Sequence, residues 1–497
     1  MGIEREVKLG ASTAFRLPDF GDLGPDVKVV PRSTQILLAV YHDTPDLRLA
    51  RWGVTLRHRS GDGSKWTVKL PEGDDGPALV RRELDFEGPA DRMPAPAAAV
   101  VLAYARGVPL VPVAQLRTER SGVDLIGGDG TKVAEIVDDE VSVIHDGQVA
   151  ARFREVEVEL GEGAAAGLLD TLVSRLRGAG AGAPDSTPKV FRALGPRALG
   201  RPDVDVPAVA RNATAAGVVT QAIASSVVAI LRHDPGVRIG ENPEDVHQAW
   251  VGARRLRFDL RTFGPILDEA WLTPLRDDLR WFAGLLGEVR DVDVLDDRLR
   301  RQAAGVAQPY GEVLAPLFGQ LATEREEARS TLAGAMTSPR YIALLDELVA
   351  GARAPRFAPG SDRPAGKALP ELVAWPWKRL RAEVRRLPPD PSADDLHQVR
   401  TRAERARYAV EAVGPLGGKR AGQLADALAD LQVVLGDHHD AVVAEGWLRW
   451  SLSSAAPAVQ EAAQELVVLQ RSEAEASRRR WRPAWEMASA KRLRSWL

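Results

Sequence analysis

The spacing of apolar residues changes near residue 160 of this 497-residue chain. Before that point apolar and polar residues alternate, as over residues 3–9, 54–59 and 154–160, and a period of two is typical of β-strands. From about residue 208 the apolar residues recur every three to four positions, which is typical of amphipathic helices. We therefore predict an α+β multidomain protein, with a strand domain over residues 1–200 and an all-helical domain over residues 208–497.

The strand region predicts an antiparallel sandwich or barrel, because its short strands are separated by turn sequences such as residues 60–63, 71–74 and 127–130. One face of these strands is aliphatic and the other is charged. The charged positions are Glu4, Glu6, Lys8, Arg57, Arg59, Glu155, Glu157 and Glu159. An outer face in solvent accounts for each strand alone, whereas a closed barrel with a charged lumen accounts for all of them together.

The chain contains no cysteine, which excludes disulfides, thiolate metal sites and cysteine nucleophiles and favours a reducing compartment. The N-terminus is charged and lacks the apolar segment of a signal peptide. No uninterrupted apolar run approaches 18 residues, so no membrane span is predicted. We expect a cytoplasmic protein.

The net charge of −3 conceals two nearly balanced halves. Residues 1–200 carry 25 Lys and Arg against 29 Asp and Glu, and the remaining residues carry 41 against 40. Neither half has the basic excess of a nucleic-acid-binding domain, so no nucleic-acid partner is predicted. An anion-binding site must therefore come from the arrangement of the charges.

Three carboxylates on one strand face repel each other unless solvent or cations separate them. Oxygen ligands of this kind suit Mg²⁺ or Mn²⁺ rather than zinc. Cationic strands that face metal-holding acidic strands form a receptor for a polyanion, and triphosphate is the natural candidate because metal ions and Arg or Lys neutralise its oxygens together.

Several motifs in this region resemble the CYTH domain, the family of triphosphate tunnel metalloenzymes. They are Glu4-x-Glu6-x-Lys8, Tyr41-His-Asp43-Thr44, the run from Gly53 to Arg59, and Trp66-Thr-Val-Lys69-Leu-Pro. The resemblance implies an eight-stranded antiparallel tunnel that holds triphosphate with basic side chains and metal with acidic ones. The implied metal ligands are Glu4, Glu6, Glu83, Asp138, Glu155 and Glu157, with Asp139 as the alternative to Asp138. The implied triphosphate ligands are Lys8, Arg57, Arg59, Lys69, Arg120 and Lys189. Glu4, Glu6 and Lys8 are the implied catalytic residues.

The helical region contains an internal duplication. His247 and His397 open similar helices 150 residues apart, and Gly287 and Gly436 lie in similar motifs 149 residues apart. A Pro- and Gly-rich break over residues 353–370 separates the two repeats, which we place at about 208–352 and 368–497. Residues 184–207 are also rich in Pro, Gly and Arg, and they predict a linker between the domains.

The duplicated histidines, each followed by arginines, resemble the CHAD domain, a helical family that often follows CYTH. The resemblance implies polyphosphate binding by a basic surface between the repeats, and with it association with polyphosphate granules in the cytoplasm. The implied residues are His247, Arg254, Arg255, Arg257, Arg261, Arg290, His397, Arg400, Arg405, Arg407 and His438, with His439 beside them. Each repeat departs from the pattern once, because Trp250 and Glu404 stand at positions where a basic residue is expected.

The leading functional hypothesis is metal-dependent hydrolysis of inorganic triphosphate or short-chain polyphosphate in the tunnel, with polyphosphate held by the helical domain. One alternative is a polyphosphate-binding protein whose tunnel does not turn over its ligand. The other is a CYTH-type activity on thiamine triphosphate or on ATP, as in an adenylate cyclase. The motifs leave the oligomeric state open.

Overall fold

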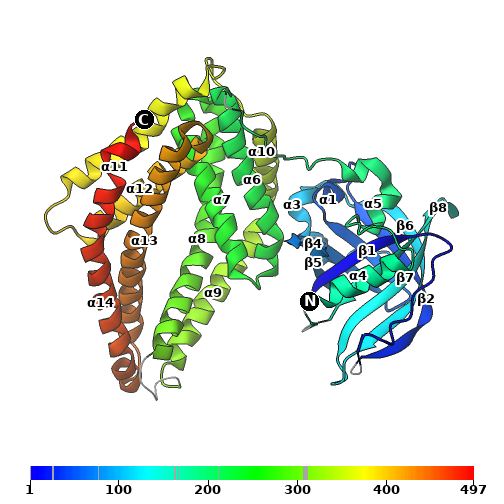
Figure 1. The fold of residues 1–497 in the computed structure, drawn as a ribbon. Helices are drawn as coiled ribbons and strands as arrows, with labels where there is room; N and C mark the ends of the chain where they lie inside the picture. Colours follow the sequence, from blue (N-terminus) through cyan, green and yellow to red (C-terminus); the bar gives the residue numbers. More distant parts are fainter. Residues whose placement is uncertain are drawn as a thin grey trace. The chain divides into compact units, whose positions relative to one another are not determined.

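The computed structural model describes residues 2–24, 27–75, 78–161, 164–165, 167–210, 212–305 and 312–496. The side chains of residues 2–5, 73–75, 78–79 and 415 lie outside this description, so the predicted role of the Glu4 side chain does too. The chain divides into two compact units, Met1–Asp203 and Val204–Leu497. Each unit is considered by itself (Figure 1).

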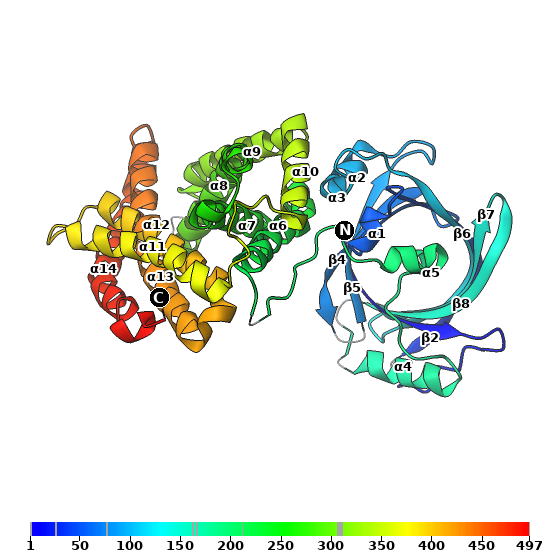
Figure 2. The same ribbon diagram turned by 90° about the horizontal axis from the view of Figure 1, so that it is seen from above.

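The first unit is built on eight antiparallel strands that close into a barrel, as predicted. The order around the ring is β1-β5-β4-β3-β2-β6-β7-β8, and β8 pairs with β1 to close it. Figure 2 shows this ring nearly end on. The strands are β1 (Gly2–Ala11), β2 (Lys28–Asp43), β3 (Thr55–Ser60), β4 (Lys65–Asp75), β5 (Ala78–Glu87), β6 (Val111–Ile126), β7 (Lys132–His145) and β8 (Gln148–Leu160).

The aliphatic face of the strands points outward, which decides between the two interpretations of the sequence. Val7, Leu9, Val156 and Val158 form a buried cluster on the outside of the barrel. Leu172 of helix α4 (Leu168–Gly178) packs into the same cluster. Since side chains alternate along a strand, the charged residues between these positions must point into the lumen. Short helices α1 (Arg48–Arg51), α2 (Ala95–Val100) and α3 (Leu102–Ala105) complete the connections.

Part of the predicted linker is folded and belongs to the barrel unit. Helix α5 (Lys189–Leu194) and the 3₁₀ helix Gly195–Leu199 occupy the segment that its Pro and Gly content marked as a connection. In the view of Figure 2, α5 lies across the opening of the ring. Val190 and Phe191 are buried against Tyr41 and Leu116. The prediction of a linker over residues 184–207 is therefore wrong for the residues up to 199.

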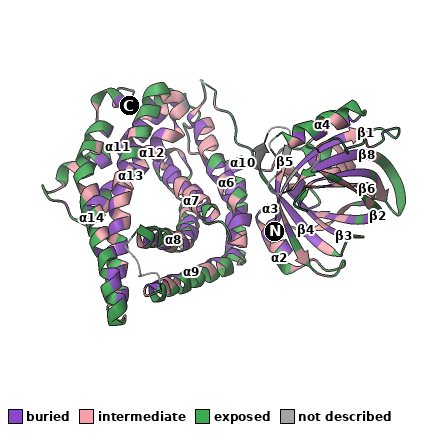
Figure 3. Cartoon of the chain, turned by 60° about the horizontal axis from the view of Figure 1, so that its bottom comes forward, coloured by how far each residue is buried: buried purple, intermediate pink, exposed green. Residues whose placement is uncertain are grey.

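The second unit is helical, as predicted. Its helices are α6 (Ala215–Ile239), α7 (Pro243–Thr262), α8 (Glu269–Gly305), α9 (Ala315–Met336), α10 (Pro339–Arg353), α11 (Ala365–Arg386), α12 (Ala393–Ala412), α13 (Gly414–Leu452) and α14 (Pro457–Ala488). Within each repeat, consecutive helices pack against each other. Figure 3 shows that α9 is exposed along much of its length, consistent with its few buried residues.

The element bounds reproduce the duplication. Helices α6 and α11 begin 150 residues apart, and α7 and α12 begin and end with the same offset. The two repeats also meet in a reciprocal backbone contact: Ala215 N donates to Arg363 O, and Ala365 N donates to Ala213 O. These donors and acceptors are again 150 residues apart. Such a two-way contact is the mark of an approximate two-fold axis between the repeats.

Helix α6 is the one described helix that is long and apolar enough to cross a membrane by length and composition alone. Of its most apolar 18-residue window, 61% is buried inside the structure. Core helices of folded domains pass the same test, so this finding carries no conclusion about a membrane.

Candidate functional site

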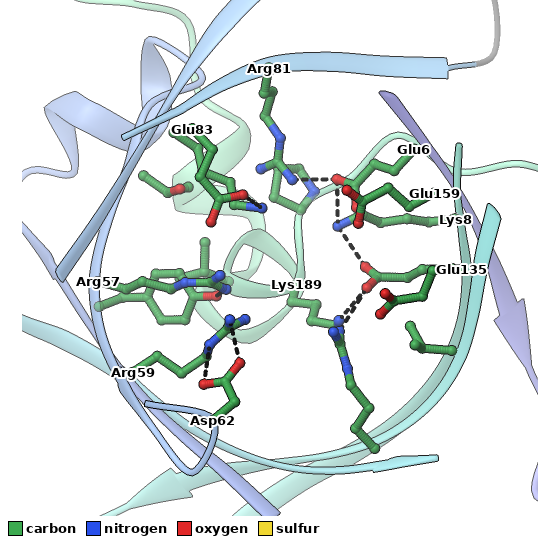
Figure 4. Close-up of a pocket in the computed structure, with 18 of the residues that line it drawn as sticks. Glu6, Lys8, Arg57, Arg59, Asp62, Arg81, Glu83, Glu135, Glu159 and Lys189 are labelled. Atoms are coloured by element: carbon green, nitrogen blue, oxygen red, sulfur yellow. Dashed lines mark hydrogen bonds and ion pairs between the residues drawn. The ribbon is translucent and has the colours of Figure 1, made fainter. Parts of the chain in front are cut away.

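The barrel encloses a cavity of about 240 Å³ whose walls are charged on all sides. In Figure 4, Arg57 and Arg59 point into it from one wall, and Glu6, Lys8, Glu135 and Glu159 point into it from the opposite wall. The ring order explains this opposition, because β3 and β8 are separated by three strands in either direction. The charged lining residues are Glu6, Lys8, Arg32, Arg57, Arg59, Asp62, Lys69, Arg81, Glu83, Arg120, Glu135, Glu157, Glu159 and Lys189.

Glu157 lies where three cations converge. Its carboxylate is 2.8 Å from Lys8 Nζ, 2.9 Å from Lys189 Nζ and 3.0 Å from Arg120 Nη2. Burial opposes ionisation, but Lys189, Lys8 and Arg120 outweigh it and hold the pKa of Glu157 well below its usual range. The group is a buried carboxylate that stays ionised because of its partners.

The Lys8 ammonium is held between strands β1 and β8. Lys8 pairs in register with Glu157, and Glu6 pairs with Glu159. Lys8 Nζ also lies 3.1 Å from Glu6, which binds the Arg81 guanidinium as well. Burial lowers the pKa of Lys8, but Glu157 and Glu6 outweigh it, so that the pKa rises above its ordinary value.

The opposite wall has its own pairs. Lys69 Nζ lies 3.1 Å from Glu83, and Arg59 lies 2.6 Å from Asp62. Arg57 Nη1 donates to the phenol oxygen of Tyr41 at 3.3 Å. Burial raises the pKa of Tyr41, but Arg57 and the lysines of the lumen outweigh it, so that the pKa falls below its ordinary value. The cations of this wall therefore favour negative charge at the Tyr41 oxygen, although Glu83 and Asp62 already pair with two of them.

Of the two adjacent aspartates of β7, Asp139 points inward and Asp138 does not. Asp138 lies on the outer face, where Arg154 binds both of its oxygens at 2.8 and 2.6 Å. Asp139 is fully buried and accepts hydrogen bonds from Arg120 at 2.8 and 2.7 Å and from Lys189. The prediction that Asp138 points inward is therefore wrong, because successive residues of a strand face opposite sides.

Glu155 shares the inward face of β8 but lies beside helix α5 and does not line the cavity. It is fully buried, and its oxygens are 3.4 Å from Lys189 and 3.6 Å from Arg192. Burial and the neighbouring Glu157 raise its pKa, against the pull of Lys189. Glu155 thus helps to dock α5, the helix that delivers Lys189 into the lumen.

The donor set of the lumen fits a hard divalent cation. The described ligating groups that line the cavity are carboxylates, with no histidine or cysteine among them. Glu6 and Glu159 stand directly opposite each other on neighbouring strands, an arrangement of like charges that a cation stabilises. Within the described ranges, however, no three acidic or histidine side chains converge as they stand, because Lys and Arg hold the carboxylates apart. A metal must therefore displace these ion pairs.

Several lining residues were not predicted from the sequence. Arg81 lies on β5 two residues before Glu83, and Glu135 lies on β7 four residues before Asp139. Both share the inward face with residues that were predicted, so counting by twos along each strand identifies them. Arg32, which binds Glu135 at 2.7 Å, carried no comparable signal because the sequence around it does not alternate.

The helical unit holds a pocket of about 40 Å³ formed by five arginines around Phe258. The arginines, which we call the arginine pocket, are Arg257, Arg261, Arg276, Arg280 and Arg405. Three of them were predicted. Burial, Arg261 and Arg402 lower the pKa of Arg405 to about 10, and burial and neighbouring arginines also lower the pKa of Arg257. The repulsion among these cations favours an anion in the pocket.

His397 and His439 form a second group. Their Nδ1 atoms are 3.2 Å apart, and burial, His397 and Arg400 lower the pKa of His439 to about 4. The prediction named His438, with His439 beside it. His438 is buried on another side of α13, where burial and Arg478 lower its pKa against the effect of Glu475. His438 therefore does not join His397, and the neighbouring His439 takes that place.

The other predicted residues divide between two places. His247, Arg254 and Arg290 gather around the ring of Trp250, with the guanidinium groups 4.8 and 5.1 Å from its centre. Arg255 and Arg407 instead flank Glu411, which both bind. The structure thus distributes the predicted basic surface over several groups, of which the arginine pocket is the most concentrated.

Family comparisons match both units. The model of the CYTH domain matches residues 2–190, and the model of the CHAD domain matches residues 221–449. Two uncharacterised proteins of Mycobacterium tuberculosis are each 32% identical to the chain over 470 residues, which is 89% of this chain and 86% of the relative.

Solved structures resemble each unit. PptA from Streptomyces chartreusis is 26% identical with a TM-score of 0.47 and covers 55% of this chain and 99% of its own. The CHAD domain from the plant Ricinus communis is 26% identical with the same score and covers 58% and 96%. A Hippeastrum protein described as a putative adenylyl cyclase with a dominant triphosphatase activity is 18% identical with a score of 0.25 and covers 39% and 98%. On the family models and the two mycobacterial relatives, the chain belongs to the proteins that join a CYTH domain to a CHAD domain.

Proposed function

We propose that the barrel hydrolyses the terminal phosphoanhydride of inorganic triphosphate or short-chain polyphosphate with Mg²⁺ or Mn²⁺. The observation that carries the proposal is the lumen itself, a cavity of about 240 Å³ with cations and carboxylates on facing walls. The CYTH family includes triphosphatases and cyclases, and its enzymes bind triphosphate compounds with divalent metal ions.

The basic and the acidic residues of the lumen would have different roles. Arg57, Arg59 and Lys69 on one wall and Lys8, Arg120 and Lys189 on the other would bind and orient the phosphate oxygens. Glu6, Glu157 and Glu159 would hold the metal. When bound, the divalent cation would neutralise phosphate charge and make its water more acidic. Water attacks the terminal phosphorus, the bridging P–O bond breaks, and the products are phosphate and a chain one phosphate shorter.

The lining favours an inorganic substrate over a nucleotide or thiamine compound. Tyr41 is the only aromatic residue among the described residues of the cavity wall, and its hydroxyl is engaged by Arg57. A base or a thiazole ring has no aromatic platform there to stack on. The charged lining instead matches a ligand that carries phosphate along its whole length.

Phosphate release from tripolyphosphate, thiamine triphosphate and ATP, compared side by side with Mg²⁺ and with Mn²⁺, tests this proposal. We expect the highest rate on tripolyphosphate and a loss of at least tenfold in Lys8→Ala, since the variant removes a charge-assisted phosphate contact. Arg154→Ala, on the outer face of β8, is the matched control. If no substrate is hydrolysed with either metal, the proposal fails.

We further propose that the helical unit binds polyphosphate through the arginine pocket. The support is the unrelieved repulsion among Arg257, Arg261 and Arg405, whose pKa values are all lowered. A chain of phosphates matches such a pocket because arginine binds phosphate with two parallel hydrogen bonds. Binding of a fluorescent polyphosphate to the full-length chain, measured over a range of salt, tests this part.

A further inference from the structure

The cations of the lumen are already bound by carboxylates. Lys8, Arg120 and Lys189, which we call the three-cation cluster, meet at Glu157 within 3.0 Å. Arg81 and Lys8 bind Glu6, and Lys69 binds Glu83. The groups that would bind phosphate are thus neutralised by the groups that would bind metal.

Glu157 forms more ion pairs than the other carboxylates of this group. Its side chain is 9% exposed, and those of Lys8, Arg120 and Lys189 are between 5% and 17% exposed. Both of its oxygens are used, Oε1 by Lys8 and Oε2 by Arg120 and Lys189. A carboxylate is a planar anion with two acceptor oxygens, so it occupies this cluster much as one edge of a phosphate group would.

We propose that Glu157 is a specificity-determining residue that occupies the phosphate site until a divalent cation binds its carboxylate. The inference rests on the proposed function of the lumen, and it adds which form of the phosphate ligand the barrel selects. The barrel binds triphosphate and a divalent cation together and rejects metal-free phosphate anions.

The physical reason is the cost of an unpaired buried charge. Phosphate that takes over the three-cation cluster alone leaves the Glu157 carboxylate buried beside a second anion. A divalent cation that binds alone takes Glu157 from three buried cations, which then share only Glu6, Asp139 and Glu155 among the described residues. When both bind, each displaced group acquires a new partner, so each ligand strengthens the binding of the other by the same factor.

The decisive experiment removes the charge of Glu157 and keeps its shape. Calorimetric titration of tripolyphosphate into the full-length protein in EDTA compares the unaltered chain, Glu157→Gln and Asp138→Asn. We expect Glu157→Gln to bind metal-free tripolyphosphate about tenfold to a hundredfold more tightly, since a competing charged partner is gone. Asp138→Asn is the matched control, because Asp138 is equally buried and bound to arginine but faces outward. We expect its affinity to be unchanged.

A second measurement tests the inference even if a variant is less stable than the unaltered chain. Glu157→Gln removes one carboxylate partner from each of three cations, so it should unfold at a lower temperature, and tripolyphosphate in EDTA should raise that temperature more than it does for the unaltered chain. Glu6→Gln, which releases Lys8 and Arg81, should show the same gain to a smaller extent. An equal or weaker metal-free affinity in both variants overturns the inference.

The outcomes separate this inference from the proposed function. If the unaltered chain hydrolyses tripolyphosphate with Mg²⁺ but neither variant gains metal-free affinity, the barrel is a hydrolase without the Glu157 mechanism. If the unaltered chain binds metal-free tripolyphosphate as tightly as it does with Mg²⁺, the inference is wrong whether or not hydrolysis occurs. If no tripolyphosphate binds under any condition, both proposals fail.

Discussion

Arg254 and Glu404 occupy equivalent positions in the two helical repeats and bind each other. They lie 150 residues apart, each seven residues after the repeated histidine. Arg254 Nε donates to Glu404 Oε1 at 2.6 Å, and a second bond joins the other atoms of the two groups. Two arginines at this place would face each other across the approximate two-fold axis. The glutamate therefore turns a repulsion between the repeats into a buried ion pair.

The first prediction concerns this pair. Glu404→Gln should lower the free energy of unfolding by about 2–3 kcal/mol, below the usual cost of breaking a buried pair because the Arg254 side chain is 20% exposed. The exchange Arg254→Glu with Glu404→Arg should recover most of the loss, since the two positions are equivalent. Urea denaturation of the two single variants and the exchange provides the measurement. A double variant no more stable than the single ones would contradict the symmetric pairing.

The second prediction concerns the arginine pocket. Arg257→Ala and Arg405→Ala should each weaken polyphosphate binding about tenfold, because each removes a charge-assisted contact with phosphate. The same changes should leave stability equal or slightly higher, since they relieve repulsion. Arg301→Ala is the control, because that exposed residue on α8 pairs with Asp297. An equal loss in the control would indicate general charge attraction instead of a pocket.

The third prediction is a pH dependence from the pair His397 and His439. Burial and the nearby Arg400 and Arg290 lower the pKa of His439, whereas Asp291 raises it. Burial and the facing Arg400 and Arg254 lower the pKa of His397, whereas Asp394 and Glu404 raise it. Asp440 lies in the same group and faces Arg290 and Arg400. At pH 7 both rings are therefore neutral in the free protein.

A phosphate beside these rings favours their protonated forms, so the bound state takes up protons that the free state lacks. Polyphosphate affinity should therefore rise as the pH falls from about 6.5, the ordinary histidine pKa, towards about 4, the lowered pKa of His439. Fluorescence anisotropy at fixed salt measures this. His439→Asn should flatten the profile, and His438→Asn should not. A flat profile in the unaltered chain would show that polyphosphate does not reach the pair.

The alternation of the strands predicted which residues share a charged face, because a period of two fixes the face of each residue, and the structure places that face in the lumen. The same rule distinguishes Asp139 from Asp138, since Ala134 and Ile136 belong to the outer apolar cluster and thus place odd-numbered residues of β7 inside. The repeat offset of 149 likewise relates Arg290 to His439 and not to His438. These two errors were errors of counting, not limits of the sequence.

Other features depend on contacts that no local pattern contains. Helix α5 has six residues, too few to form from propensity, and it is held by the ion pairs of Lys189 with Asp139 and Glu157. Its composition therefore resembles a linker. The bond between Arg254 and Glu404 joins helices from separate repeats, so the sequence showed only a missing basic residue where the structure shows a partner.

The fourth prediction concerns Asp259 on α7, which is 1% exposed and whose carboxyl oxygens accept no hydrogen bond from the residues that the structure describes. Burial raises its pKa to about 8. Between pH 4 and pH 8 the folded state therefore holds a proton that the unfolded state has released, so stability falls as the pH rises through this range. Asp259→Asn has no carboxyl group to titrate here, so it does not lose this stability. The free energy of unfolding of the variant, relative to that of the unaltered chain, should therefore rise by about 2 kcal/mol or more from pH 5 to pH 8. Thermal and urea unfolding across this range check the trend. Asp277→Asn, a change at an exposed acid, should show none.

The fifth prediction compares two adjacent arginines of β5. Arg81 points into the lumen and binds Glu6, whereas Arg82 points outward and binds Glu72. Arg81→Ala should reduce tripolyphosphate hydrolysis about tenfold to a hundredfold, because it removes a cation that orients Glu6 and faces the phosphates. Arg82→Ala changes the same residue type on the same strand and should keep the activity of the unaltered chain. Initial rates with Mg²⁺, with unfolding temperatures to confirm that both variants are folded, make the comparison. Equal losses in the two variants would mean that the chemistry does not take place in the lumen.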